Sequence, residues 1–445
     1  MPLETWALLS YHTAERGVVM ALDTQKNYRN LVMYSVFVRN HTKEGTFRAL
    51  VSDLDRIKAL GVDIVWLMPI HPLGEKARKG SLGSPYAIRD YRAVNPEYGT
   101  LEDFRYLVDE IHARGMRCII DVVYNHTSPD SVLASEHPEW FYHKPDGSFG
   151  NRVGDWTDII DLDYSNPGLW DYQIETLKMW AQIVDGFRCD VAPLVPLAFW
   201  LRARREVEEV RPGCFWLAES VEPEFIISMR ERGLVGHSDS EMYQAFDVCY
   251  DYDIFGAFRA CLKGELPLAD YIARVAAQEY IYPDNYVKLR YLENHDNTRA
   301  AFLLPDESML LNWTAFMFFQ KGLTLIYGGQ ECGAAHLPSL FDRDSVAWDT
   351  GRDYSGLFAR LSQLKKDPLF SLGAYSLSAL PGGVIRGSYA LGERRALGVF
   401  CTRAQPALIP VDWPNGTYVN QFDGSSIEIH AGMLSTAGGP VIILN

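Results

Sequence analysis

Eight short apolar runs, most of them separated by segments with helical spacing, constrain the fold of this chain more than any other feature. The runs are rich in β-branched and aromatic residues and are bounded by turns, which is typical of buried strands. They cover residues 32–39, 63–69, 116–124, 186–190, 215–219, 243–248, 287–293 and 323–327. Strands that are apolar nearly throughout indicate a parallel sheet that is covered on both faces.

Eight such strands alternating with helices predict a closed (β/α)₈ barrel. An open, doubly wound sheet is the alternative, but no GxGxxG sequence follows the first run, and a count of eight favours closure. Between the strands we expect one helix over 46–60 and another over 101–114, which Gly115 would end.

Two segments depart from the alternation and suggest further structural units. Residues 127–163 contain turns and aromatic residues but no convincing helix, so we expect an inserted lobe after the third strand. A helix over 351–366 ends the alternating pattern, and short strands with Gly and Pro turns follow it. The expected organisation is a barrel over 1–126 and 164–370, the lobe over 127–163, and an antiparallel β domain over 371–445.

The charge balance excludes some classes of partner. With 42 basic and 57 acidic residues the net charge is −15, so the field of the protein repels nucleic acid and anionic membranes. The N-terminus lacks the pattern of a secretory signal, and no apolar run reaches the roughly 18 residues of a membrane span. Seven scattered cysteines without a CxxC pair indicate free thiols. We therefore expect a cytoplasmic protein.

Polar residues follow four of the predicted strands at their carboxyl ends, the position at which barrels of this type carry their chemistry. They are Asp121, Asn125 and His126 after the third strand, Arg188 and Asp190 after the fourth, Glu219 after the fifth, and His295 and Asp296 after the seventh. One such acid alone would be interpreted as a helix N-cap. Helix capping does not require acids, imidazoles and a guanidinium to converge, so together they predict an active site.

Three carboxylates without a metal-binding cluster or a phosphate loop favour glycoside hydrolysis. Arg188 lies two residues before Asp190, on the same side of the strand, and would keep that carboxylate ionised as the nucleophile. Glu219 ends an apolar run, whose dry surroundings favour the raised pKa of a general acid/base. Asp296 would stabilise the positive charge of the transition state.

The segments that carry these residues resemble a known family. DVVYNH (121–126), GFRCD (186–190), LAES (217–220) and ENHDN (293–297) resemble the four signature regions of the α-amylase superfamily, glycoside hydrolase family 13. The resemblance extends to GVDIVWLMPI, SPYAIRDYRAVNPEYGT, IIDLDYSNP and GLTLIYGGQE, and so covers the barrel.

The resemblance implies the same roles for Asp190, Glu219 and Asp296. It also implies that Tyr86 stacks on the sugar, that His126 and His295 bond its hydroxyls, and that Arg188 orients the nucleophile. We place Asp121 with these substrate-binding residues. The family's calcium site resembles Asn125 with Asp161. Calcium takes six to eight oxygen ligands, however, and Asn125 could instead brace its loop.

The expected function is that of a retaining hydrolase of α-1,4-glucosidic bonds in maltooligosaccharides and starch. Many starch α-amylases have Lys and His shortly after the nucleophile, whereas here the sequence continues Val-Ala-Pro-Leu at 191–194, which favours short maltooligosaccharides. A transglycosylating relative is the alternative, either a glucanotransferase or an enzyme similar to cyclomaltodextrinases and neopullulanases. A non-catalytic carbohydrate-binding barrel is a remote third, because all three acids are present.

Overall fold

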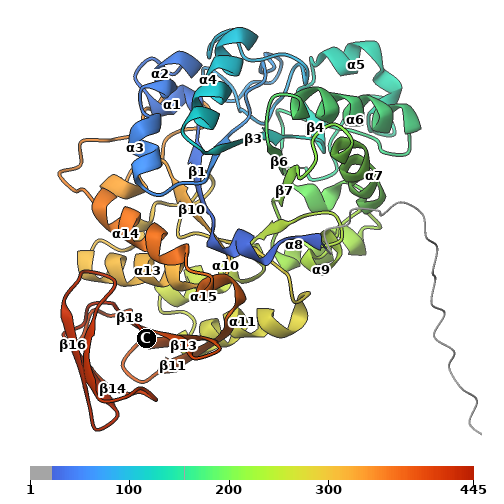
Figure 1. The fold of residues 1–445 in the computed structure, drawn as a ribbon. Coiled ribbons are helices and arrows are strands. Elements are labelled where there is room, and N and C mark those ends of the chain that lie inside the picture. The colour runs from blue at the N-terminus through green and yellow to red at the C-terminus, as the bar shows by residue number, and fades with distance from the viewer. Residues whose placement is uncertain (1–22, 155) are drawn as a thin grey trace, which may run out of the picture.

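A closed barrel of eight parallel strands lies at the centre of the computed structural model, which describes residues 23–154 and 156–445 (Figure 1). The barrel strands are β1 (Val32–Val36), β2 (Ile64–Leu67), β3 (Arg117–Val122), β6 (Gly186–Cys189), β7 (Phe215–Ala218), β8 (Val248–Tyr250), β9 (Lys288–Arg290) and β10 (Leu323–Tyr327). The first strand pairs with both β2 and β10, which closes the ring. The predicted (β/α)₈ barrel is confirmed, and the open sheet is wrong.

Helices form a layer around the barrel (Figure 1). They include α4 (Leu101–Ala113), α6 (Pro167–Ala181), α7 (Leu197–Glu208), α8 (Pro223–Glu231), α10 (Tyr252–Leu262), α11 (Leu268–Ile281), α13 (Glu307–Phe319) and α14 (Ser355–Lys365), with short helices α12 (Ala300–Leu303) and α15 (Leu369–Leu372). Helix α4 begins at a capping box made by Thr100 and Asp103 and is followed by Gly115 at φ +65°, as its sequence predicts.

The sixth strand lies elsewhere than the sequence pattern indicates. The pattern predicts it over 243–248, but β8 covers Val248–Tyr250, and the short helix α9 (Asp239–Met242) and a turn precede it. Tyr243 and Phe246 in that turn are 5% and 0% exposed. These residues are apolar because they are buried beneath the outer layer of the barrel, although they do not form a strand.

The helix expected over 46–60 is two helices, α2 (Phe47–Val51) and α3 (Leu54–Ala59). The Ser52 hydroxyl donates to the Ala49 carbonyl at 2.7 Å at the break, a local bond that competes with helix continuation. The first strand ends at Val36, and α1 (Val38–His41) replaces the rest of its predicted run.

The segment after β3 leaves and rejoins the barrel through a small sheet. Strand β4 (His126–Thr127) pairs antiparallel with β5 (Ile160–Asp161). Between them lies a helix that the sequence pattern does not predict, α5 (Val132–Glu136), whose N-terminus is capped by the Ser131 side chain.

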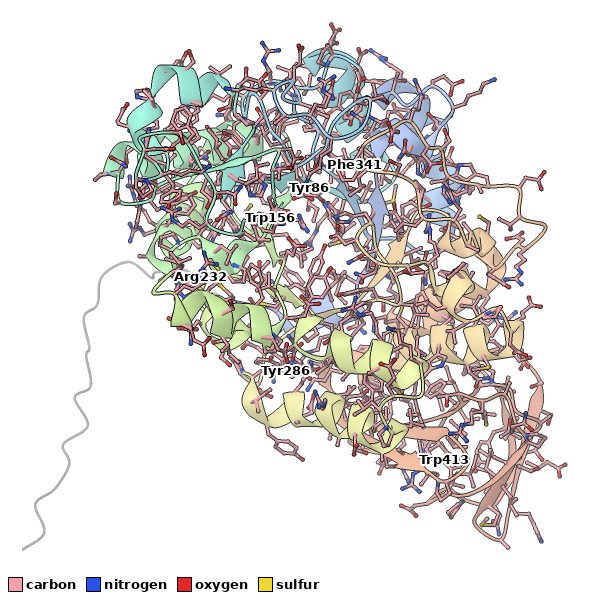
Figure 2. The ribbon with its side chains drawn as sticks, turned by 180° about the vertical axis from the view of Figure 1, so that it is seen from behind. Tyr86, Trp156, Arg232, Tyr286, Phe341 and Trp413 are labelled. Atoms are coloured by element: carbon pink, nitrogen blue, oxygen red, sulfur yellow. The ribbon has the colours of Figure 1, made fainter. Side chains whose placement is uncertain are left out.

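Two antiparallel sheets of four strands follow the barrel, in agreement with the predicted fold class. One contains β11 (Ala374–Leu380), β12 (Val384–Leu391), β13 (Arg394–Cys401) and β18 (Val441–Leu444), and the other β14 (Ala407–Pro410), β17 (Met433–Thr436), β16 (Ser426–His430) and β15 (Gly416–Val419). Figure 2 labels Trp413 among them; it is 6% exposed and packs edge-on against Tyr418 at 6.1 Å.

Two further expectations concern the whole chain. All seven cysteines lie in the described residues and are free, and only Cys261 is not buried. Within residues 23–154 and 156–445, no helix combines the length and apolar character needed to cross a bilayer. The N-terminal stretch in which we found no secretory signal lies outside the described residues.

Candidate active site

Neighbouring barrel strands bring the predicted catalytic groups together at their carboxyl ends. Asp121 on β3 is paired in register with Arg188 on β6. Asp190 and Glu219 directly follow β6 and β7, whose last residues are also in register. The parallel register therefore sets these four side chains at one end of the barrel.

Arg188 lies at the centre of this group and is fully buried. Its Nη1 donates to Asp121 Oδ1 at 2.8 Å and to Asp190 Oδ1 at 2.9 Å. Its Nη2 lies 2.7 Å from Glu219 Oε1, an ion pair without the angle of an aligned hydrogen bond. One guanidinium thus faces three carboxylates, and burial raises the pKa of Asp121 to about 7 against the opposing effect of Arg188.

Glu219 has the environment of a general acid. Burial raises its pKa well above the ordinary value, and this outweighs the lowering effect of Arg188. Its Oε2 accepts the backbone N–H of Val191 at 2.8 Å. Val191 has a left-handed backbone (φ +34°), which is rare for a β-branched residue and turns this N–H toward Glu219.

Tyr86 and His295 form the opposite part of the site. The Tyr86 hydroxyl lies 2.7 Å from His295 Nε2 and donates to Asp121 Oδ2 at 3.2 Å. The two rings are stacked, with centroids 5.5 Å apart and planes at 16°. Burial lowers the pKa of His295, whose Nε2 is also 3.1 Å from Asp296 Oδ2. Tyr86, Asp121, His295 and Asp296 therefore form one connected group.

A cavity of about 330 Å³ lies over these residues. It is lined by Lys79, Ser84, Tyr86, His126, Trp156, Asp158, Ile159, Asp190, Val191, Glu219, Asp296, Leu340 and Phe341. The proposed nucleophile, acid/base and third carboxylate thus face one space. Asp121 and Arg188 are 0% exposed and lie beneath it, so they are placed to position other side chains. Asp121 was predicted to bind substrate, and that role stays a prediction, since this side chain does not line the cavity.

Several cavity residues lack the sequence signal that identified the others. Trp156, Asp158 and Phe341 lie in loops, and Lys79 lies in the long connection after β2. The catalytic residues were predicted because each is a polar residue at or near the end of a strand. None of these four residues lies at the end of a strand. Figure 2 shows Tyr86, Trp156 and Phe341 close together although they come from three separate segments.

The calcium candidates Asn125 and Asp161 line a second cavity of about 300 Å³, together with Asp163. Asp161 Oδ1 is buried and has no hydrogen-bond partner, which suits a cation. Arg152 lies 3.7 Å from the other carboxylate oxygen of Asp161 and donates its backbone N–H to it at 2.6 Å. In residues 23–154 and 156–445 no three His, Cys, Asp or Glu side chains are grouped to hold a metal ion.

Comparison with protein families agrees with this geometry. Residues 27–369 match the model of the α-amylase catalytic domain, and residues 376–443 match the model of the bacterial α-amylase C-terminal domain. The two matches together span nearly the whole described chain.

Solved structures and curated proteins extend the comparison. An α-amylase from Lactobacillus plantarum is 48% identical with a TM-score of 0.93, and the match covers 95% of this chain and all of that one. The noncanonic maltogenic α-amylase AmyB from Thermotoga neapolitana is 34% identical with a TM-score of 0.84, over 94% and 99% of the two chains. The trehalose synthase/amylase TreS of Mycolicibacterium smegmatis is 28% identical over 74% of this chain and 68% of its own length.

The match to one curated maltosyltransferase covers only part of this chain. An α-1,4-glucan:maltose-1-phosphate maltosyltransferase of Myxococcus xanthus is 35% identical over 47% of this chain, and the matched region spans about a third of that protein, 35%.

Proposed function

This chain belongs to the α-amylase family, glycoside hydrolase family 13, whose members act on α-glucans, and on that premise we propose that it is a retaining hydrolase of α-1,4-glucosidic bonds in maltooligosaccharides and starch. The observation that carries the proposal is the arrangement around Arg188. This guanidinium holds Asp190 at 2.9 Å and Glu219 at 2.7 Å, while burial raises the pKa of Glu219 as a proton donor requires.

In the first half of the reaction the Asp190 carboxylate attacks the anomeric carbon of the bound glucosyl residue. Glu219, protonated because burial raises its pKa, donates its proton to the glycosidic oxygen as the bond to the leaving chain breaks. Asp296 carries negative charge beside the same cavity and stabilises the positive charge that develops on the sugar ring. The product is a glycosyl ester on Asp190 and a free sugar chain.

In the second half Glu219, now ionised, removes a proton from water, and the water oxygen attacks the anomeric carbon. The ester bond to Asp190 breaks and the carboxylate is restored. Because two inversions occur at the same carbon, the product keeps the α configuration.

The lengths over which this chain matches the α-amylases and the maltosyltransferase favour hydrolysis over transfer. The α-amylase at 48% identity and the maltogenic α-amylase at 34% match over nearly their full lengths, whereas the maltosyltransferase matches over 35% of its own. A transferase would use the same ester on Asp190 and release it to a sugar hydroxyl. Formation of chains longer than the substrate would favour that alternative.

Replacement of the two acids tests the mechanism. Asp190→Asn and Glu219→Gln should each lower kcat for maltoheptaose by at least about 10³-fold, because the nucleophile or the proton donor is lost. Lys178→Ala, which breaks an exposed ion pair with Glu175, is the control and should keep full activity. NMR of the first product should show the α anomer, and a β product or an active Asp190→Asn enzyme would refute the proposal.

We also propose calcium at Asn125 and Asp161, where it would brace the junction between the inserted segment and the barrel. The orphaned Asp161 Oδ1 supports this, and the nearby Arg152 opposes it. Dialysis against EDTA should lower Tm, added calcium should restore it, and Asp161→Asn should remove the response. An unchanged Tm after EDTA would show that calcium is not part of the structure.

A cytoplasmic location is supported by the seven free cysteines, because disulfides are rare in reducing compartments. Thiol titration of the denatured protein should find seven reactive groups.

A further inference from the structure

Three loops meet at the active-site cavity and line it together with the catalytic acids. Five of the residues that line the cavity belong to these loops, and we call them together the glycone wall. They are Lys79 from the loop after β2, Trp156 and Asp158 from the inserted segment, and Leu340 and Phe341 from the loop after β10. The wall combines two aromatic rings with one basic and one acidic group. Flat rings and charged hydrogen-bonding groups are suited to the faces and hydroxyls of a sugar.

The loops after β2 and β10 are fastened to each other. The Leu82 N–H donates to the Phe341 carbonyl at 2.9 Å, and the Ser81 N–H and hydroxyl both donate to Asp342 Oδ1. Gly80 has φ +62°, and a Cβ there would lie 2.7 Å from the Phe341 carbonyl oxygen, so this close approach requires glycine. The two loops therefore act as one piece.

A buried guanidinium reinforces the same junction. Arg39 is 3% exposed, and its Nη1 donates to the carbonyls of Gly83 and Leu340 at 3.2 and 3.3 Å. This places the wall on a rigid support that belongs to the barrel.

One ion pair joins this piece to the inserted segment. Lys79 Nζ lies 2.8 Å from Asp158 Oδ1, and the Asp158 side chain is only 6% exposed. Loss of the partner of a carboxylate that is buried to this extent is costly, so the pair fastens the loop after β2 to the inserted segment beside the cavity.

The order of the strands shows which end of the sugar chain meets the wall. Around the ring the order is β1, β10, β9, β8, β7, β6, β3, β2, so β7 lies directly across from β1, and β2 and β10 flank β1. Glu219 follows β7 and protonates the leaving group. The leaving chain therefore lies on the β7 side, and the part of the wall that comes from the loops after β2 and β10, on the far side, meets the non-reducing, or glycone, end.

We propose that the Lys79–Asp158 pair closes the glycone end of the cleft, so that the enzyme removes one or two glucose units from the non-reducing end of an α-glucan. The cavity of about 330 Å³ is at the small end of the range of about 300–1,000 Å³ for small-molecule pockets, which suits a mono- or disaccharide. This inference rests on the proposed hydrolase function and adds the size of the released product.

The test compares two forms of 4-nitrophenyl maltoheptaoside, one with a free non-reducing end and one with that end blocked by an ethylidene group. The wild-type enzyme should release glucose or maltose first from the free form. It should cleave the blocked form at least about tenfold more slowly, because the closed end excludes the added group.

Variants that remove the Lys79–Asp158 ion pair should open the glycone end of the cavity. In Lys79→Met/Asp158→Asn, which removes both charges and leaves no unpaired buried carboxylate, the blocked substrate should be cleaved nearly as fast as the free one and longer first products should appear. Lys79→Arg keeps the pair and should retain the wild-type pattern. Lys178→Ala removes an ion pair of similar length, 2.7 Å, on the surface and should change nothing. Tm is measured for each variant to confirm folding.

The outcomes separate the two proposals. If the wild-type enzyme cleaves neither substrate, the proposed hydrolase function fails. If it cleaves both at equal rates into mixed lengths, or if the folded double variant keeps the wild-type product pattern, the hydrolase stands and the closed glycone end is refuted.

Discussion

At the scale of single residues, the left-handed backbone of Val191 connects local strain to the chemistry of the acid/base. Its φ is +34°, a conformation in which a β-branched residue is strained, and its N–H donates to Glu219 Oε2 at 2.8 Å. A hydrogen bond to a carboxylate stabilises the ionised form and lowers the pKa. This contact therefore limits how far burial raises the pKa of Glu219.

Val191→Gly should relieve the strain and raise the free energy of unfolding by about 1 kcal/mol. Glycine holds the N–H less firmly, so the pKa of Glu219 should rise. Since activity needs Glu219 protonated at the first step, the alkaline limb of kcat/KM should move to higher pH, and kcat should fall. A pH–rate profile and a thermal melt measure both effects.

Ala404→Gly is the matched control, because Ala404 also has a left-handed backbone, φ +52°, but lies in the C-terminal domain. It should leave the pH profile unchanged. A Val191→Gly enzyme with the wild-type profile would show that this N–H does not influence Glu219.

At the scale of elements, the contact between β6 and β7 decides whether the catalytic acids meet. Gly186 begins β6, and a Cβ there would lie 2.2 Å from the carbonyl oxygen of Phe215 on β7. The strand therefore needs glycine for a close backbone approach, in addition to the apolar residues that bury it.

Gly186→Ala should push the two strands apart, lower the free energy of unfolding by about 1–3 kcal/mol or more, and reduce kcat by displacing Arg188 and Asp190. Gly256→Ala is the control: Gly256 lies within α10, a Cβ there would point into open space, and alanine should stabilise the helix by up to about 1 kcal/mol. Urea unfolding followed by circular dichroism compares them. Equal stability of the two variants would contradict the strand-contact argument.

At the scale of the whole molecule, the C-terminal sheets and the barrel share one core. Phe319 at the end of α13 packs against Phe400 and Tyr389 of the first sheet, with ring centroids 5.3 Å apart in each case. Asn312 on the same helix is fully buried, accepts the Cys401 N–H at 2.7 Å and donates to the Gly438 carbonyl at 2.9 Å. This one side chain therefore bonds two parts of the C-terminal domain.

Asn312→Ala should leave the Cys401 N–H and the Gly438 carbonyl buried without partners, at a cost of about 1–3 kcal/mol for each group. We expect a lower Tm and faster hydrogen exchange in β13 than in the barrel strands. Asn415→Ala, which removes an exposed bond to the Gly432 N–H, should have little effect. If hydrogen exchange became equally fast in the barrel strands and in β13 of the Asn312→Ala protein, the loss of stability would not be confined to the C-terminal domain, and the prediction would be wrong.

The sequence by itself determined the barrel and the acids at its rim. Apolar runs and the residues that end them are local signals, and parallel register brings strand ends together whatever the loops do. Asp190, Glu219 and Asp296 could therefore be found from strand ends, since each follows a strand or lies shortly after one. The sixth strand was misplaced because a buried turn is as apolar as a strand.

Only the tertiary structure decided the glycone wall and the burial of Asp121. Lys79 and Asp158 lie in irregular segments of the chain, and no periodic pattern relates them. Their contact depends on how three loops pack after the barrel has closed, and a charged residue in a loop has the same sequence signal whether it is paired or solvated. Strand chemistry is thus encoded locally, whereas the shape of the cleft arises from contacts between distant parts of the chain.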